Sequence, residues 1–148
     1  MIQRIQSIWL FLAAMLNGLV FIGPLYKFNY GTMGLAYSPW QNESVRSYSP
    51  LLIIAVIMTL LPLVAIFFFK DRKRQKGLVW LSIISILGFL ALMFMHVGNL
   101  KNATPPATNM TYVLPGFIPC IIALLFLFFA MAGIRKDDKL VKSLDRLR

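Results

Sequence analysis

The sequence contains a single cysteine, Cys120, and only five acidic residues among 148. One cysteine excludes an internal disulfide and leaves no second thiol for a metal or redox site. The sequence also has no P-loop, G-x-G-x-x-G loop, H-E-x-x-H helix or C-x-x-C pair, which are signatures of phosphate, zinc and redox chemistry. These absences predict a chain with no catalytic residues, no metal ligands and no cofactor, and we expect that it is not an enzyme.

Apolar residues are in excess: they make up 59% of the chain, whereas charged residues make up 14%. Soluble domains have about 45–50% apolar and about 25% charged residues, so the composition indicates a membrane protein. Four apolar segments approach the roughly 20 residues that a helix needs to cross the hydrocarbon core. They cover residues 7–26, 51–69, 78–100 and 114–134. None of them alternates as the strands of a membrane barrel do.

These segments predict an all-α integral membrane protein, with a four-transmembrane-helix bundle over residues 1–134 and a basic tail over 135–148. Backbone amides in hydrocarbon must be paired within their own segment, which favours helices over strands. The first segment is long for the apolar region of a secretory signal and no convincing A-x-A site follows it. We therefore expect a retained helix and four crossings, which return the chain to its starting side.

Lysine and arginine are distributed unevenly around the four segments. Twelve of the 15 lie at Arg4, in the turn over 70–77 and in the tail, and three lie on the other side, at Lys27, Arg46 and Lys101. Because basic residues gather on the cytoplasmic side of membrane proteins, this bias predicts that both termini are cytoplasmic. A net charge of +10 is also typical of nucleic-acid binding, but membrane orientation explains it without a nucleic-acid partner.

Ionisable residues inside a membrane are costly and are usually functional, yet the four segments contain no Asp, Glu, Lys or Arg. Their polar residues of note are Asn17, His96 and Asn99. We expect Asn17 to bond to a neighbouring helix. His96 lies about 6 Å from the outer end of its segment, where it can reach interfacial water. The alternative is a pH-sensitive outer vestibule made by His96 with Asn99.

Two further features concern packing. Pro62 has no N–H, so it frees the carbonyl of Met58 and predicts a kink, with Thr59 helping to satisfy the freed group. Ser82 and Ser85 are three apart on one face of the third segment, and with Gly88 their small size predicts an edge for close helix packing. The outer loops are rich in Tyr, Gly, Ser and Pro, and we expect them to cap the bundle without folding as a separate domain.

The tail has the pattern of a short amphipathic cytoplasmic helix. Leu140, Leu144 and Leu147 fall at i, i+4 and i+7, which gives one narrow apolar stripe. The tail also allows one favourable charge pair at i, i+4 and one at i, i+3. Such a helix can lie on anionic lipid headgroups or dock on another membrane protein. The residues predicted to make either contact are Arg135, Lys136, Asp138, Lys139, Leu140, Lys142, Leu144, Asp145, Arg146, Leu147 and Arg148.

The opening MIQRIQSIWLFLAA, the basic turn KDRKRQKG and the ending GIRKDDKLVKSLDRLR closely resemble an uncharacterised domain-of-unknown-function family of four-span membrane proteins from Bacteroidota. The resemblance covers essentially the whole chain and is most specific at the two termini. It implies a bacterial inner-membrane protein with no assigned activity. It supplies no catalytic residues.

Two hypotheses of function are consistent with the sequence. The first is an accessory, structural or assembly subunit of a larger bacterial inner-membrane complex, which docks through its cytoplasmic tail and helix faces. The alternative is a small-molecule or lipid transporter with an outward-side pocket near His96, Asn99 and Asn17.

Overall fold

The computed structural model of the chain describes the backbone at residues 2–22, 26–30, 33–37, 49–69, 71–103, 109–112 and 114–145. Side chains are described over 6–22, 50–69, 71–95 and 118–141 and at Ser143, and the exposure of Gly98 is described in addition. These residues are called the described residues below.

Four α-helices contain most of the described residues. They are α1 (Ile2–Gly18), α2 (Ser49–Phe67), α3 (Arg72–Ala103) and α4 (Leu114–Asp145), and a short 3-10 helix η1 (Leu19–Phe21) extends α1. The stretches Pro50–Phe67, Arg72–Met95 and Ile118–Val141 are long and apolar enough to cross a membrane, whereas that of the first helix, Gln6–Phe21, is shorter. The predicted helical architecture is thereby confirmed.

Helix boundaries differ from the expected segments at several points. The first segment was expected to run to Tyr26, but α1 ends at Gly18, η1 ends at Phe21 and Tyr26 belongs to β1. Most of the predicted turn over 70–77 forms the start of α3, which begins at Arg72. The predicted tail helix is the continuation of α4, which runs without a break from Leu114 to Asp145.

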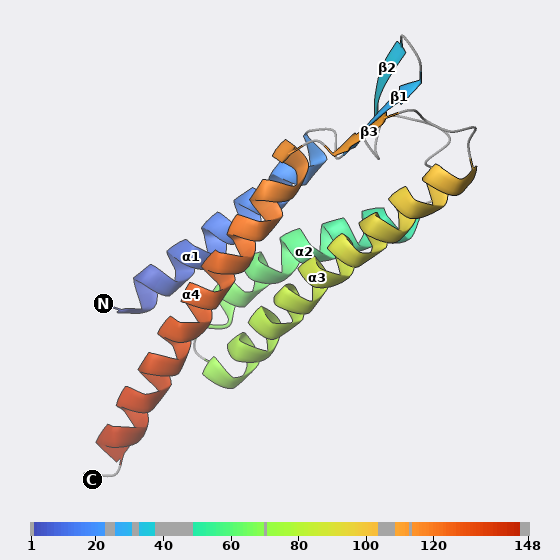
Figure 1. Cartoon of the computed structure of the whole chain (residues 1–148). Helices are drawn as coiled ribbons and strands as arrows, with labels where there is room; N and C mark the ends of the chain where they lie inside the picture. The colour runs from blue at the N-terminus through green and yellow to red at the C-terminus, as the bar shows by residue number, and fades with distance from the viewer. Residues whose placement is uncertain are drawn as a thin grey trace.

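The helices pack as a bundle in which α1 contacts α2 and α4, and α3 contacts α2 and α4. Both chain ends lie at one end of the bundle, and α4 projects there beyond the other helices (Figure 1). Small residues let the backbones approach closely. Those fully buried in the core are Ala13, Ala55, Ala65, Ala123 and Ala130.

Larger side chains fill the space between the helices. Leu10, Met58, Phe89 and Leu127, one from each helix, are fully buried. The Trp9 ring of α1 lies against two phenylalanines of α4, with centroid distances of 5.3 Å and 5.6 Å. Aromatic pairs at this separation add to the energy of area burial, which strengthens the contact between α1 and α4.

A three-stranded antiparallel sheet lies at the opposite end of the bundle (Figure 1). Its strands are β1 (Tyr26–Tyr30), β2 (Met33–Tyr37) and β3 (Asn109–Tyr112), in the order β2-β1-β3. The all-α prediction did not include this sheet. The sheet joins the two outer loops to each other, because β1 pairs with a strand that lies far along the chain.

Candidate functional site

Polar side chains gather where the two termini lie, in a cluster that we call the polar end. Its members come from three helices: Gln6 of α1, then Arg72, Gln75 and Lys76 of α3, then Asp137 and Asp138 of α4. Gln6, Gln75 and Asp137 are buried. Buried polar groups are costly unless they are hydrogen-bonded. The hydrogen-bond partners of these side chains therefore determine whether the cluster stabilises the bundle.

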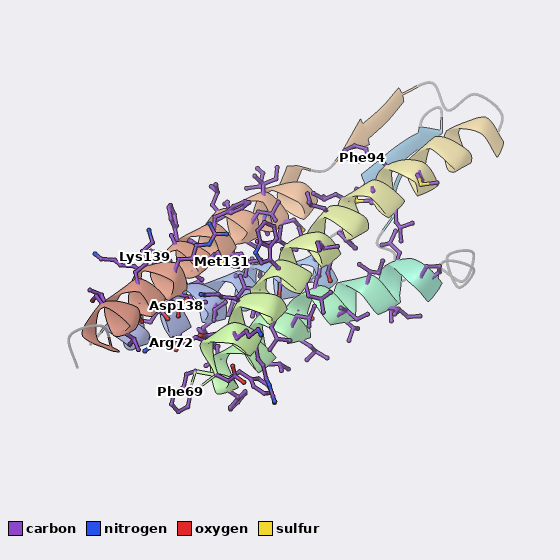
Figure 2. The ribbon with its side chains drawn as sticks, turned by 90° about the horizontal axis from the view of Figure 1, so that it is seen from below. Phe69, Arg72, Phe94, Met131, Asp138 and Lys139 are labelled. Atoms are coloured by element: carbon purple, nitrogen blue, oxygen red, sulfur yellow. The ribbon has the colours of Figure 1, made fainter. Side chains whose placement is uncertain are left out.

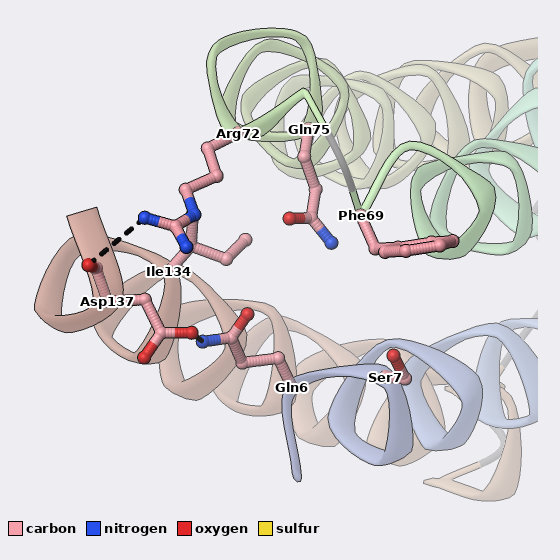
Figure 3. A pocket seen from close by; sticks show the side chains of 7 residues that line it. All are labelled: Gln6, Ser7, Phe69, Arg72, Gln75, Ile134 and Asp137. Atoms are coloured by element: carbon pink, nitrogen blue, oxygen red, sulfur yellow. Dashed lines mark hydrogen bonds between the residues drawn. The ribbon is translucent and has the colours of Figure 1, made fainter. Parts of the chain in front are cut away.

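Asp137 is the centre of the cluster. The Gln6 Nε2 group donates a hydrogen bond to Asp137 Oδ2 at 2.6 Å, and Arg72 Nη1 donates to the Asp137 backbone oxygen at 3.2 Å (Figure 3). The carboxylate is only 7% exposed. Hydrogen bonds to charged groups contribute more than neutral ones, so these contacts hold α4 against both α1 and α3.

Asp138 makes a second link between α4 and α3. Its carboxylate forms an ion pair with the Lys76 ammonium group, and both side chains are about three-quarters covered. At the start of α3, Asp71 Oδ1 accepts a hydrogen bond from the Arg74 backbone N–H at 3.2 Å, which is the action of an N-cap. The Asp71 carboxylate also pairs with the exposed Arg74 side chain at 2.9 Å.

Gly133 allows α1 and α4 to meet closely at the same level. A Cβ atom at this position would lie 2.9 Å from Gln6 Cγ, which is closer than carbon atoms approach without displacement. Gly88 was expected to mark a close-packing edge, and this expectation is wrong: a Cβ atom there would meet nothing within 4 Å. Ser82 is buried as expected, and its hydroxyl donates to the Leu78 carbonyl of its own helix.

A small pocket opens between the three helices of the polar end. Gln6, Ser7, Phe69, Arg72, Gln75, Ile134 and Asp137 line it, and the Gln75 carboxamide points into it (Figure 3). Only about 10 Å³ of this space is open to a water molecule, which corresponds to roughly one such molecule. The pocket is therefore too small for a metabolite. Within the described residues, no three His, Cys, Asp or Glu side chains are grouped as a metal site requires.

A family model described as "Domain of unknown function (DUF4293)" matches residues 2–147 of the chain. The chain belongs to this family. No curated protein and no solved structure matches it. Membership of the DUF4293 family confirms the predicted resemblance to an uncharacterised family and supplies no activity.

In this DUF4293 member, some of the predicted contact residues of the tail are exposed and one faces the bundle. Arg135, Lys136, Lys139 and Leu140 are exposed, whereas Asp138 turns inward to Lys76. Figure 2 shows Asp138 on the side of α4 that faces α3, and Lys139 pointing away from the other helices. Lys142, Leu144 and Asp145 belong to α4, but their side chains are outside the described residues, as are Arg146, Leu147 and Arg148 altogether.

The three polar residues predicted within the membrane segments lie at different depths. Asn17 is fully buried, and its Nδ2 group donates to the Met58 carbonyl of α2 at 2.9 Å, as expected for a bond between helices. His96 and Asn99 lie on α3, with side chains outside the described residues. Met58 lies about 14 Å from Phe67 along α2, and His96 lies about 36 Å from Arg72 along α3.

Sequence reasoning missed Gln6, Arg72, Gln75 and Asp137 as members of one cluster. One signal was present for Asp137. The buried residues of α4 recur at Leu127, Ala130 and Ile134, and the same helical spacing of three to four residues continues to position 137. A carboxylate at a position that continues a core stripe indicates a buried hydrogen-bond partner.

Proposed function

We propose that this chain is an accessory, structural or assembly subunit of a larger bacterial inner-membrane protein complex. In this proposal the four helices cross the membrane, both termini are cytoplasmic, and the chain has no catalytic role. Three helices with stretches long and apolar enough to span, and the placement of both chain ends at one end of the bundle, support this arrangement. The strong bias of Lys and Arg toward that end supports the orientation.

The observation that carries the proposal is the extension of α4 beyond the bundle. Arg135 and Lys136 mark the point where α4 changes from apolar to charged, and we place the membrane boundary there. Beyond it, Leu140 and Val141 are 48% and 38% exposed. Apolar side chains outside the hydrocarbon gain by being covered, and a partner protein in the same complex provides such a cover.

The polar end holds the projecting part of α4 in place for such a contact. The Gln6–Asp137 hydrogen bond and the Lys76–Asp138 ion pair lie within one helical turn of Leu140, so the projecting part of α4 is anchored at its base. A rigid binding element loses less conformational entropy on association than a flexible one. The anchored helix is therefore better suited to docking than a loose tail.

Capture of partners from native membranes in mild detergent tests this proposal. The tagged full chain is compared with L140S/V141S, which removes the apolar edge, and with L140M/V141I, which keeps it. We expect one or more membrane proteins to accompany the wild type and L140M/V141I and to be lost with L140S/V141S. Recovery of the isolated chain alone, with or without the tail, would contradict the proposal.

A transporter with an outward-side pocket near His96, Asn99 and Asn17 is the second candidate. One observation favours it: Asn17 Oδ1 is buried and has no hydrogen-bond partner among the described residues. The difference in depth between Asn17 and His96 counts against a single shared pocket. Flux measurements in liposomes decide, because a transporter would show flux that changes in the His96→Gln variant, whereas inert liposomes would argue against transport.

A further inference from the structure

We propose that Arg135, Lys136 and Lys139 form a binding site for the headgroups of anionic phospholipids on the outward face of α4. This site rests on the membrane placement given under the proposed function, and it does not depend on a protein partner. Its residues are distinct from the apolar pair Leu140 and Val141, which lies at and beyond the last turn of the site.

In the fold, the acidic and the basic residues of the sequence RKDDK, residues 135–139, lie on different sides of α4. Asp137 is buried against Gln6, and Asp138 is paired with Lys76 of α3. Both acids are therefore turned toward the bundle, while Arg135, Lys136 and Lys139 are exposed. The sequence RKDDK contains charges of both signs, but the charged side chains exposed on this part of α4 are all basic among the described residues.

The three cations lie at the end of the exposed apolar surface of α4. Leu125 and Phe128 are about half exposed, and successive steps of three or four residues lead from them through Ala132 to Lys136 and Lys139. Residues at this spacing lie on one face of a helix. The basic residues thus continue the face that is turned to lipid, and Lys139 lies about 10 Å beyond Ala132, at the depth of the headgroups.

The three cations lie close to one another on α4. Arg135 and Lys139 are spaced i, i+4, and Lys136 and Lys139 are spaced i, i+3, and like charges at these spacings repel each other. None of the ion pairs among the described residues involves any of the three. An anionic headgroup between them would relieve this repulsion, and an arginine adds bidentate hydrogen bonds to a phosphate.

The test compares lipid retention by the purified full chain in micelles that contain equal amounts of phosphatidylglycerol and phosphatidylcholine. Native mass spectrometry counts the lipids of each kind that stay bound. Each basic residue close to an anionic surface contributes about a fivefold preference. We therefore expect the preference of the wild type for phosphatidylglycerol to fall at least about tenfold in R135Q/K136Q/K139Q, and to persist in K136R/K139R, which keeps the charges.

A matched control removes the same number of charges from the predicted outer side, in K27Q/R46Q/K101Q. We expect this variant to retain phosphatidylglycerol as the wild type does. Equal retention by R135Q/K136Q/K139Q and the wild type would overturn the proposal, and so would an equal loss in the outer control. The L140S/V141S variant separates the two proposals, because it should lose its protein partner while it keeps the lipid.

Discussion

The carboxamide of Asn17 on α1 donates a hydrogen bond to the backbone carbonyl of Met58 on α2, with an N–O distance of 2.9 Å. This carbonyl is free because the residue four positions later is Pro62, which has no N–H. A side chain of one helix thus replaces the missing backbone donor of another. The contact satisfies a carbonyl that would otherwise be unpaired in the apolar core, where such groups are costly.

The pairing of Asn17 with Met58 predicts energetic coupling between positions 17 and 62. Replacing Asn17 by Leu removes the donor and keeps the number and branching of the side-chain heavy atoms, and replacing Pro62 by Ala supplies a backbone N–H to Met58. We expect N17L to cost about 1 kcal/mol more in the wild type than in the P62A background. Unfolding of the four chains in detergent measures this coupling, and additive effects within about 0.3 kcal/mol would contradict it.

The sequence predicted a donor at Asn17 and a free carbonyl at Met58, but it did not predict that the two groups bond to each other. Asn17 was expected to bond across helices and Pro62 to free a carbonyl, but the depth at which two helices cross depends on their packing and not on local pattern. The predicted role of Thr59 is wrong, because its hydroxyl donates to the carbonyls of Ala55 and Val56 in its own helix, at 3.2 Å and 2.8 Å.

Gly133 offers a second test of the packing at the polar end. A Cβ atom there would meet Gln6 Cγ at 2.9 Å, and Gln6 cannot move freely while it is bonded to Asp137. We expect G133A to destabilise the chain by about 1–3 kcal/mol, as overpacking does in protein cores. Thermal unfolding in detergent, followed by circular dichroism, measures the change.

Gly88 provides the matched control, because a Cβ atom there has open space. We expect G88A to be neutral or to stabilise the helix by up to about 1 kcal/mol, since alanine is the better helix former. In the Q6A background the clash disappears, so G133A should cost less there than in the wild type. An equal loss in both backgrounds would show that the close approach to Gln6 is not the cause.

The two adjacent aspartates of the polar end are expected to differ in their contribution to stability. D137A leaves the buried Gln6 amide without its acceptor, which costs about 1–3 kcal/mol. D138A removes an ion pair whose side chains are 27% and 25% exposed, and we expect a smaller loss of about 0.2–1 kcal/mol. D137N keeps an acceptor oxygen and serves as the control. A larger loss in D138A than in D137A would reverse our assignment of the central residue.

The proposed orientation of the chain in the membrane rests on the Lys and Arg distribution and is open to direct measurement. In a Cys120→Ala background, S143C places a thiol on the exposed end of α4 and T111C places one on β3. An impermeant maleimide added to intact cells should label T111C and leave S143C unlabelled until the membrane is permeabilised. Labelling of S143C from outside would place the tail on the opposite side from the one proposed.

The outer sheet was not predicted, although part of its signal is visible. Residues 26–30, with the sequence YKFNY, alternate between aromatic and polar side chains, as a half-buried strand does. The partner strand β3 has only four residues and lies beyond two long helices, α2 and α3. Local pattern therefore identifies β1, but it cannot select a pairing between loops so far apart in the sequence.

The pairing of β1 with β3 places Lys27 directly opposite Thr111. Opposed residues in antiparallel strands have Cα atoms about 4.5–5.5 Å apart, within the range that a disulfide spans. We expect K27C/T111C, in the Cys120→Ala background, to form an internal disulfide under oxidising conditions, and free-thiol titration with mass spectrometry measures it. The shifted pair K27C/N109C is the control, because Asn109 faces Asn29. Equal cross-linking of both pairs would mean that the register does not hold and that the two loops are not fixed to each other by this sheet.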